Sequence, residues 1–268
     1  MSGRSYSSDQ PLRSIAGAAV LITGAGSGMG AAAARLFAAE GAWVAVTDRD
    51  GDAAEAVAAS ITATGVADSG GRARAWQLDV GDGAAIVRVV DEVVAEFDGL
   101  DCLINNAGFA PRVPIDGDDY EDVWSGAIDA MLTAVPRTVR AALPSLRRSP
   151  FPRIVNVAST EAHATSGGLT PYAAAKAGVT GITRGLAVEL GPEGVTVNAI
   201  LPGPIETGLT KPIPDEHKQI FARRRTALRR YGRPEEIAHI MLDLCLPSAS
   251  YVTGASIPVD GGLLIRNG

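Results

Sequence analysis

Short runs of apolar residues alternate along the chain with longer stretches in which apolar residues recur at helical spacing. The runs predict strands at 18–23, 42–48, 73–79, 100–105, 153–158, 195–201 and 256–259, and helices are expected at about 28–40, 50–64, 82–97, 117–147, 170–190, 214–229 and 234–246. A run that is apolar at nearly every position is typical of a strand buried on both faces. The alternation therefore predicts an α/β fold, a doubly wound parallel sheet with right-handed crossovers.

No linker-like stretch or internal repeat interrupts this alternation, so a single domain is expected over residues 14–268. Residues 1–13 are polar and rich in serine, without the apolar core of a signal peptide, and predict a flexible N-terminal tail. The segment at about 204–231 is interpreted as an insertion that caps the substrate site.

The composition excludes several classes of protein. Hydrophobic residues make up 46% and charged residues 20% of the chain, which is typical of a globular domain. A net charge of -6 argues against nucleic acid as a partner. The two cysteines and three histidines lack metal-ligand spacing, so no metal is expected. The apolar run at 15–22 is too short to cross a bilayer, so a cytoplasmic protein without a membrane partner is expected.

A glycine-rich segment at 23–30, TGAGSGMG, lies between the first strand and the first helix. Glycines there let the backbone turn tightly and approach a pyrophosphate, which then sits at the helix N-terminus. A glycine-rich turn that binds no ligand is the alternative, but the position between strand and helix favours a nucleotide. The expected contacts are Gly24, Ser27, Gly28, Met29 and Gly30.

Other candidate cofactor contacts end neighbouring strands, where open α/β sheets bind ligands. Asp48 would accept the adenosine ribose hydroxyls and repel a 2′-phosphate, which favours NAD over NADP. The alternative is a strand-end Asp that only caps the next helix, and Arg49 is a complication because its guanidinium could receive that phosphate. The further expected contacts are Asp79 and Val80, which end the third strand where an adenine edge could be held, and Asn106, Ala107 and Gly108, which end the fourth.

Tyr172 and Lys176 are one helical turn apart and share a face. A cation close to a phenol favours the phenolate, which brings the pKa of Tyr172 towards a value useful for proton exchange with an alcohol. Such pairs are common in helices, but the chain has only three lysines, so this one is interpreted as chemical. Ser159, at the end of the fifth strand, could donate to a substrate oxygen or merely satisfy backbone groups.

Taken together, TGxxxGxG at 23–30, NNAG at 105–108, Ser159, YxxxK at 172–176 and Pro202-Gly203 resemble the classical short-chain dehydrogenase/reductase family. The resemblance covers about residues 15–262 and implies a seven-stranded Rossmann-type sheet, a homotetramer, and a catalytic set of Ser, Tyr, Lys and Asn. It implies that Ser159 orients the substrate carbonyl, Tyr172 is the acid–base, and Lys176 holds the nicotinamide ribose and lowers the pKa of the tyrosine. The implied nicotinamide contacts are Tyr172, Lys176, Pro202, Gly203, Ile205 and Thr207.

The asparagine of that set is missing. In the family pattern it stands seven residues after a tryptophan, and counting from Trp124 reaches Met131. The resemblance implies a distorted helix at this position, with a main-chain carbonyl that holds a water contacted by the lysine. Pro136 has no N–H for the carbonyl of Leu132, so we hypothesise that it bends the helix and frees a carbonyl near Met131 or Leu132 for such a water. A proline that only ends or kinks a surface helix is the alternative.

The substrate pocket is expected to include an apolar wall at Phe109 and ionisable groups at Glu161 and His163. These two would suit a substrate with a second hydroxyl or an amide, or they could face solvent. The leading hypothesis is an NAD-dependent oxidoreductase for a secondary alcohol or ketone. The arginines at 223–225 raise an alternative, a 3-oxoacyl-thioester reductase whose carrier is phosphorylated. A catalytically weak nucleotide-sensing or scaffolding protein is a third possibility, to which the missing asparagine lends support.

Overall fold

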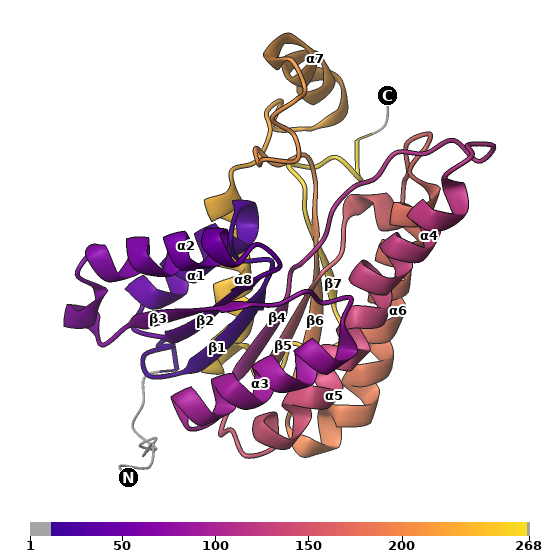
Figure 1. The fold of residues 1–268 in the computed structure, drawn as a ribbon. Helices are drawn as coiled ribbons and strands as arrows, with labels where there is room; N and C mark the ends of the chain where they lie inside the picture. Colours follow the sequence, from indigo (N-terminus) through magenta and orange to yellow (C-terminus); the bar gives the residue numbers. More distant parts are fainter. Residues whose placement is uncertain (1–11, 267–268) are drawn as a thin grey trace.

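Seven parallel strands form the centre of the molecule (Figure 1). The structure is a computed structural model that describes residues 12–266, except for the side chains of residues 67 and 68. The strands are β1 (Ala19–Thr23), β2 (Trp43–Asp48), β3 (Arg72–Gln77), β4 (Cys102–Asn105), β5 (Arg153–Val157), β6 (Thr196–Pro202) and β7 (Ser256–Val259). Their order across the sheet is β3-β2-β1-β4-β5-β6-β7, so the predicted doubly wound Rossmann-type domain is confirmed.

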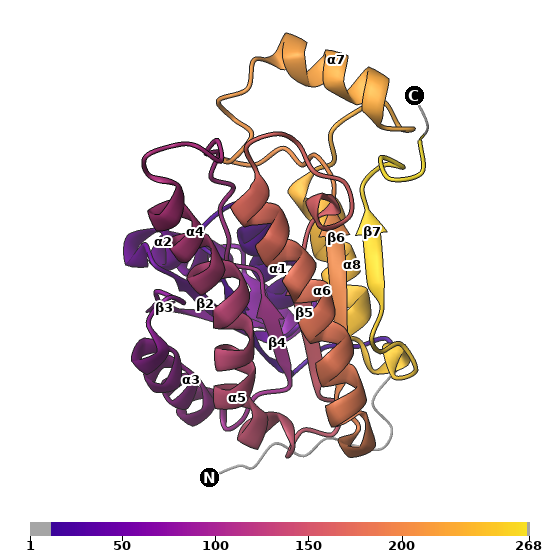
Figure 2. The same cartoon turned by 90° about the vertical axis from the view of Figure 1, so that its right-hand side faces the viewer.

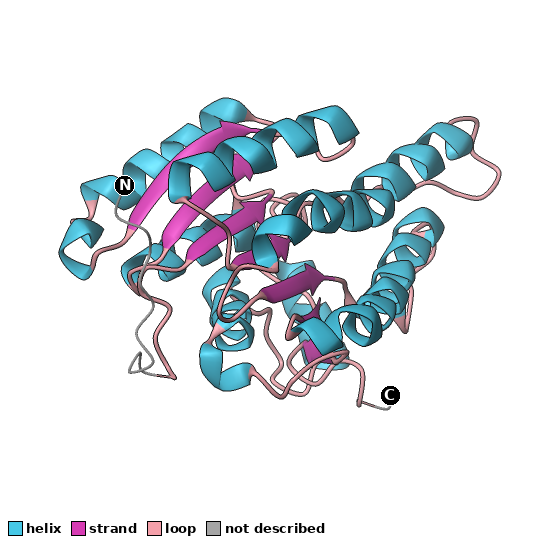
Figure 3. Cartoon of the chain, turned by 90° about the horizontal axis from the view of Figure 1, so that it is seen from below, coloured by secondary structure: helices cyan, strands magenta, loops and turns pink. Residues whose placement is uncertain are grey.

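Helices cover both faces of the sheet, as the view from below shows (Figure 3). The helices are α1 (Gly28–Ala39), α2 (Gly51–Ala63), α3 (Gly83–Phe97), α4 (Tyr120–Ile128), α5 (Ala134–Leu146), α6 (Thr170–Leu190), α7 (Asp215–Arg225) and α8 (Pro234–Cys245). One core cluster joins α1, α2 and α8 to the sheet, and a second joins α3, α5 and α6 to the opposite face. Because helices cover both faces, every residue of β1, β4, β5 and β6 is buried.

The chain changes direction across the sheet between β1 and β4. β1 pairs with β2 on one side and with β4 on the other, and the register aligns Ile22 with both Val46 and Ile104. The loops that follow β1 and β4 therefore leave the sheet side by side and turn to opposite faces. In open α/β sheets this point forms the crevice in which ligands bind.

Sequence patterns located most elements to within two residues, with three differences that concern the site. The third strand ends at Gln77, so Asp79 and Val80 follow it in the loop instead of ending it. The helix expected at 214–229 ends at Arg225. The single helix expected at 117–147 is interrupted by a π-helical turn, Asp129–Thr133, between α4 and α5.

The segment predicted to cap the substrate site projects from one end of the molecule. Helix α7 stands clear of the sheet, above the carboxyl ends of the strands (Figure 2). The predicted N-terminal tail, residues 1–13, lies outside the described residues except for its last two. Among the described residues, none of the helices combines the length and the apolar composition that a membrane span requires.

Candidate active site

The glycine-rich loop between β1 and α1 turns in a way that side chains would block. Gly24 has a φ of +63° and Gly28 a φ of +54°, both in the left-handed region that favours glycine. A Cβ on Gly30 would lie 2.3 Å from the carbonyl oxygen of Gly24. The loop is therefore built from residue types that let its backbone approach a ligand closely.

The N-terminus of α1 differs from those of the next two helices. Asp50 caps α2 by accepting from the N–H of Ala53, and Asp82 caps α3 by accepting from Ala84 and Ala85. Ser27 makes no such side-chain bond at the start of α1. Amide groups of the first turn of α1 are thereby left for an external acceptor, and a phosphate is the usual one.

Asp48 is held rigidly at the end of β2. Its Oδ2 accepts from the N–H of Gly26 at 2.9 Å, and its Oδ1 accepts from the N–H of Asp50 at 3.0 Å. Asp48 does not cap α2, which was the alternative interpretation of this residue, because Asp50 is the N-cap of that helix. Two backbone donors leave acceptor capacity on the carboxylate, which a ribose diol could use.

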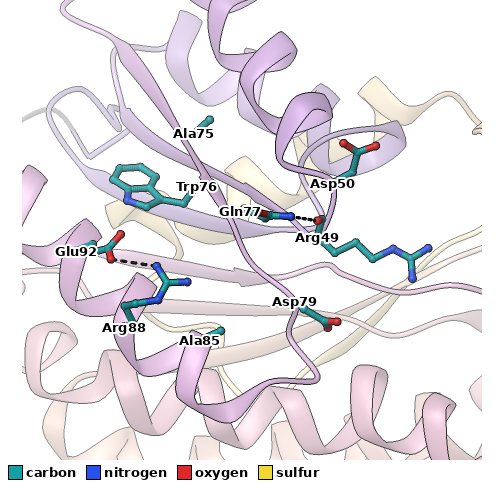
Figure 4. A pocket seen from close by; sticks show the side chains of 9 residues that line it. All are labelled: Arg49, Asp50, Ala75, Trp76, Gln77, Asp79, Ala85, Arg88 and Glu92. Atoms are coloured by element: carbon teal, nitrogen blue, oxygen red, sulfur yellow. Dashed lines mark hydrogen bonds and ion pairs between the residues drawn. The ribbon is translucent and has the colours of Figure 1, made fainter.

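An open groove of about 830 Å³ lies beyond Asp48, between the β2–α2 loop, β3 and α3 (Figure 4). Its lining includes Arg49, Asp79 and Trp76, and the Arg49 guanidinium extends away from the rest of the cluster. Gln77 donates to the carbonyl of Arg49 at 3.0 Å, which fixes the backbone but not the guanidinium. Asp79 and the complicating Arg49 therefore line one groove, whereas Val80 lines a separate small cavity with Lys176.

Asn106 ties the end of β4 to the end of β1. Its Nδ2 donates to the carbonyls of Thr23 and Gly24 at 2.8 and 3.0 Å, and the Thr23 hydroxyl accepts from the N–H groups of Asn106 and Ala107. Asn106 Oδ1 is buried without a hydrogen-bond partner in the described part of the chain. These contacts fix the loop at the switch point, and with the uncapped α1 they fit a dinucleotide.

Ser159, Tyr172 and Lys176 come together at the carboxyl end of β5. Ser159 is buried in extended backbone directly after the strand, and Tyr172 and Lys176 lie in the first two turns of α6. The Lys176 ammonium is 5.8 Å from the centre of the Tyr172 ring. The structure thus brings together the three residues that the sequence nominated for chemistry.

The pKa of Tyr172 differs in direction from the expectation. Burial raises it above its ordinary value, a hydrogen bond with Ser159 lowers it, and the negative charge of Glu161 raises it. Desolvation of the phenolate therefore outweighs stabilisation by neighbouring groups. The sequence spacing predicted the nearby cation but not the burial of the phenol, which results from packing of Tyr172 against the buried cluster around Met131.

Lys176 is almost fully enclosed, with 4% of its surface exposed. Its Nζ donates to the main-chain oxygen of Val157 at 2.8 Å. Burial lowers the pKa of Lys176 to about 8, because the charged form loses hydration inside the protein. The carbonyl of Val157 is a partner that sequence reasoning missed, and no side-chain pattern could have identified it.

Met131 lies beside Lys176, inside the π-helical turn. A Cβ built on Gly108 would be 3.4 Å from Lys176 Nζ and 3.6 Å from Met131 Sδ. A cavity with room for the centre of one water, about 10 Å³, is lined by the π turn, by Lys176 and by Thr138. The predicted distortion of this helix is present at the predicted residue.

A chain of buried polar side chains lies beneath the site. The Thr138 hydroxyl donates to Asn105 Oδ1 at 2.6 Å, Asn105 Nδ2 donates to Asn156 Oδ1 at 2.9 Å, and Asn156 Nδ2 donates to Thr183 at 3.0 Å. This network joins β4, β5, α5 and α6, so it fixes the two elements that carry Ser159 and Lys176. In the sequence, this network could have been suspected from Asn105 and Asn156, which are polar residues inside otherwise apolar strands.

The predicted substrate-pocket residues have different environments. Phe109 is half-buried and packs, as Tyr172 does, against the buried cluster around Met131. Glu161 is half-buried in the 3-10 turn after Ser159, and His163 is exposed.

The segment after β6 also reaches the glycine-rich loop. Gly203 is required by close packing, because a Cβ there would lie 2.7 Å from the Asp260 backbone. Ile205 is buried, and a Cβ on Gly28 would lie 3.4 Å from the Thr207 methyl group. Among the described residues, no cluster of three or more His, Cys, Asp or Glu side chains could hold a metal ion.

The fold and the site together define the class of protein. A Rossmann-type sheet, a loop suited to bind phosphate and a Ser–Tyr–Lys group are the features of nicotinamide-dependent oxidoreductases.

A family model described as enoyl-(acyl carrier protein) reductase matches residues 24–264. The chain is 38% identical to meso-2,3-butanediol dehydrogenase of Serratia marcescens, over 93% of this chain and 95% of that one. It is 37% identical to a 3-oxoacyl-[acyl-carrier-protein] reductase of Thermotoga maritima, over 93% and 98%. A short-chain type dehydrogenase/reductase from Mycobacterium marinum superposes with a TM-score of 0.86 at 31% identity, over 95% and 98%. The chain belongs to the short-chain dehydrogenase/reductase family.

Proposed function

We propose that this protein is an NAD-dependent oxidoreductase that interconverts a secondary alcohol and a ketone. The observation that carries the proposal is the convergence of Ser159, Tyr172 and Lys176 beside the glycine-rich loop at the switch point. The butanediol dehydrogenase among its relatives supports an alcohol as substrate. The bound nicotinamide would accept or donate the hydride.

The residues of this chain would handle the proton and the orientation. The Ser159 hydroxyl would donate to the substrate oxygen and hold it against Tyr172. The phenol of Tyr172 would receive the proton of an alcohol, or give one to a ketone. Lys176 would bind the nicotinamide ribose, and its positive charge would oppose the desolvation that now raises the pKa of Tyr172.

The cofactor would lie along the carboxyl ends of β1, β2 and β4. Its pyrophosphate would meet the N-terminus of α1, and its adenosine ribose would meet Asp48. A fixed carboxylate favours the free ribose diol of NAD over the 2′-phosphate of NADP by charge repulsion. The further contacts we propose are Gly24, Ser27, Gly28, Met29, Gly30, Asp79, Val80, Asn106, Ala107, Gly108, Pro202, Gly203, Ile205 and Thr207.

Absorbance of reduced nicotinamide at increasing concentrations of several secondary alcohols tests this function. NAD and NADP are compared in parallel arms with the wild-type protein. We expect turnover with NAD and at least one secondary alcohol. Tight NAD binding with no turnover of any alcohol or ketone would instead favour a sensing or scaffolding role.

A 3-oxoacyl-thioester reductase is the second candidate, because one relative is named as such. In its favour, Arg223, Arg224 and Arg225 are exposed at the end of α7 and could meet a phosphorylated carrier. Reduction of an acetoacetyl thioester with NADPH, at a rate above that of any simple ketone with NADH, would favour this function.

A further inference from the structure

Glu161 lies next to Ser159 of the proposed catalytic group, and its carboxylate forms no ion pair in the part of the chain that the structure describes. Glu161 follows Ser159 by two residues, and its N–H donates to the Ser159 hydroxyl oxygen at 3.1 Å. Both carboxylate oxygens accept from Ser166, one from the N–H at 2.8 Å and one from the hydroxyl at 3.3 Å. A carboxylate can accept about four hydrogen bonds, so half of the capacity of Glu161 is unused.

The loop at 109–113 carries one cation, Arg112, and it donates to the Gly167 carbonyl at 3.1 Å. Within residues 12–266, no ion pair to Glu161 is formed by Lys, Arg or His. A half-buried carboxylate without a cation gains most from a donor that a ligand brings.

The charge of Glu161 is felt at the reaction centre, because it contributes to the raised pKa of Tyr172. A second negative charge brought close to this carboxylate would be repelled. The loop at 109–113 is tied to the far end of the Glu161 loop by a bond from the Val113 N–H to the Gly168 carbonyl at 2.9 Å. The two loops are therefore linked, and Phe109 adds an apolar side chain that packs against the buried cluster around Met131.

We propose that Glu161 determines substrate specificity by accepting a hydrogen bond from a donor on the carbon next to the reacting carbinol. The substrates are then vicinal diols, hydroxy ketones or amino alcohols, and molecules with a carboxylate at that position are rejected. This inference rests on the proposed alcohol–ketone function. Glu161 would then discriminate between different alcohols, whereas the Ser–Tyr–Lys group acts on the reacting hydroxyl that all of them share.

Four secondary alcohols of similar size test the assignment: butane-2,3-diol, 3-aminobutan-2-ol, butan-2-ol and 3-hydroxybutanoate. The measured quantity is the ratio of kcat/KM between compounds, for the wild-type protein, Glu161→Gln and Ser166→Ala. We expect the wild-type protein to prefer the diol or the amino alcohol over butan-2-ol by at least about tenfold. In Glu161→Gln the preference for the amino alcohol falls at least about tenfold, and 3-hydroxybutanoate gains relative to butan-2-ol.

Ser166→Ala is the matched control, because it removes one bond that holds the carboxylate but leaves the charge. The kcat/KM ratios of Ser166→Ala should stay close to those of the wild-type protein. This result would distinguish the effect of the Glu161 charge from the effect of its hydrogen bonds to the loop. Binding of the amino alcohol to the protein, followed by thermal shift, should weaken in Glu161→Gln in parallel with kcat/KM. Unchanged ratios in Glu161→Gln would overturn the inference and leave the proposed function intact. Inactivity of the wild-type protein towards all four compounds would contradict both.

Discussion

The ammonium nitrogen of Lys176 donates a hydrogen bond to the main-chain oxygen of Val157 at 2.8 Å. This contact anchors α6 to the end of β5, and it keeps a cation in a part of the protein where hydration is lost. Burial lowers the pKa of Lys176 to about 8. The consequence can be measured in the stability of the protein.

We predict that the free energy of unfolding gains a contribution from Lys176 as pH rises from about 8 to about 10.4, the ordinary pKa of lysine. In this window the unfolded chain still binds the proton that the folded chain has released, so stability increases with pH. The expected gain is roughly 3 kcal/mol. Urea unfolding from pH 7 to pH 10, for the wild-type protein and Lys176→Met, isolates the contribution; parallel pH dependences would refute it.

The same titration can be followed directly, because the chain contains only three lysines. Lysine labelled with ¹³C at Cε should give three resonances, and Lys176→Met identifies the one that titrates lowest. A Lys176 resonance that titrates at or above the ordinary pKa of lysine, about 10.4, would contradict the prediction.

Removal of the Tyr172 hydroxyl should abolish most turnover. We expect Tyr172→Phe to lower kcat on the order of 10² to 10⁴-fold, the contribution of a general acid–base. The affinity for NAD and the melting temperature should stay close to those of the wild-type protein, because the ring and its packing remain. Tyr120→Phe is the control, since that ring stacks on Trp124 and lies away from Lys176. A near-normal kcat in Tyr172→Phe would remove the tyrosine from the mechanism.

Asp48 should make NAD bind at least about tenfold more tightly than NADP, which corresponds to about 1.4 kcal/mol. The N–H groups of Gly26 and Asp50 hold the Asp48 carboxylate in place. The 2′-phosphate of NADP would have to lie close to this carboxylate, and the two negative charges would repel each other. Titration of both cofactors against the wild-type protein, Asp48→Ser and Arg49→Ala checks this. Asp48→Ser should lose the preference, and Arg49→Ala should weaken NADP only. Equal affinities in the wild-type protein would mean that Arg49 dominates.

A closed homo-oligomer, most simply a tetramer, is expected, with residues 252–264 at an interface. Strand β7 is an edge of the sheet, and Tyr251, Val252 and Ile265 expose apolar surface close to its two ends. Such surface on a soluble chain is commonly covered by a second copy. Light scattering at micromolar concentration gives the mass, and a monomer would show that this edge is uncovered in solution.

The sequence predicted the sheet well because its central strands are apolar at most positions and are followed by glycine or polar residues. It also nominated Ser159 at a strand end and Tyr172 and Lys176 on one helix face, and the structure brings these three residues together. It could not predict the pKa of Tyr172, which depends on enclosure by residues far apart in the chain. It could not separate α4 from α5 either, because the apolar periodicity around Met131 continues through the π turn. The family resemblance and Pro136 were the two indications of the distortion.

The last prediction concerns this π turn. The N–H of Ala134 donates five residues back to Asp129, so the helix is wider here than an α-helix. Pro136 would be the donor to Leu132 in α-helical geometry and to Met131 in π geometry, and it has no N–H for either. The Leu132 carbonyl accepts a backbone N–H at the end of this turn, so it is not the free carbonyl. We propose that the missing donor of Pro136 keeps the Met131 carbonyl free at the small cavity beside Lys176, in place of the family asparagine. A water there would connect Lys176 to solvent.

Pro136→Ala restores the missing donor and should tighten the turn towards an α-helix. We expect slower hydrogen exchange of backbone amides in residues 133–137, and a lower kcat with little change in KM for NAD. Pro144→Ala is the matched control, because Pro144 also lies inside α5 but near its far end. Met131→Asn in the Pro136→Ala background should recover part of kcat, since an amide side chain can hold the distortion by hydrogen bonds. If Pro136→Ala exchanges and turns over like Pro144→Ala, then the proline only shapes a helix, and the proton reaches solvent by another path.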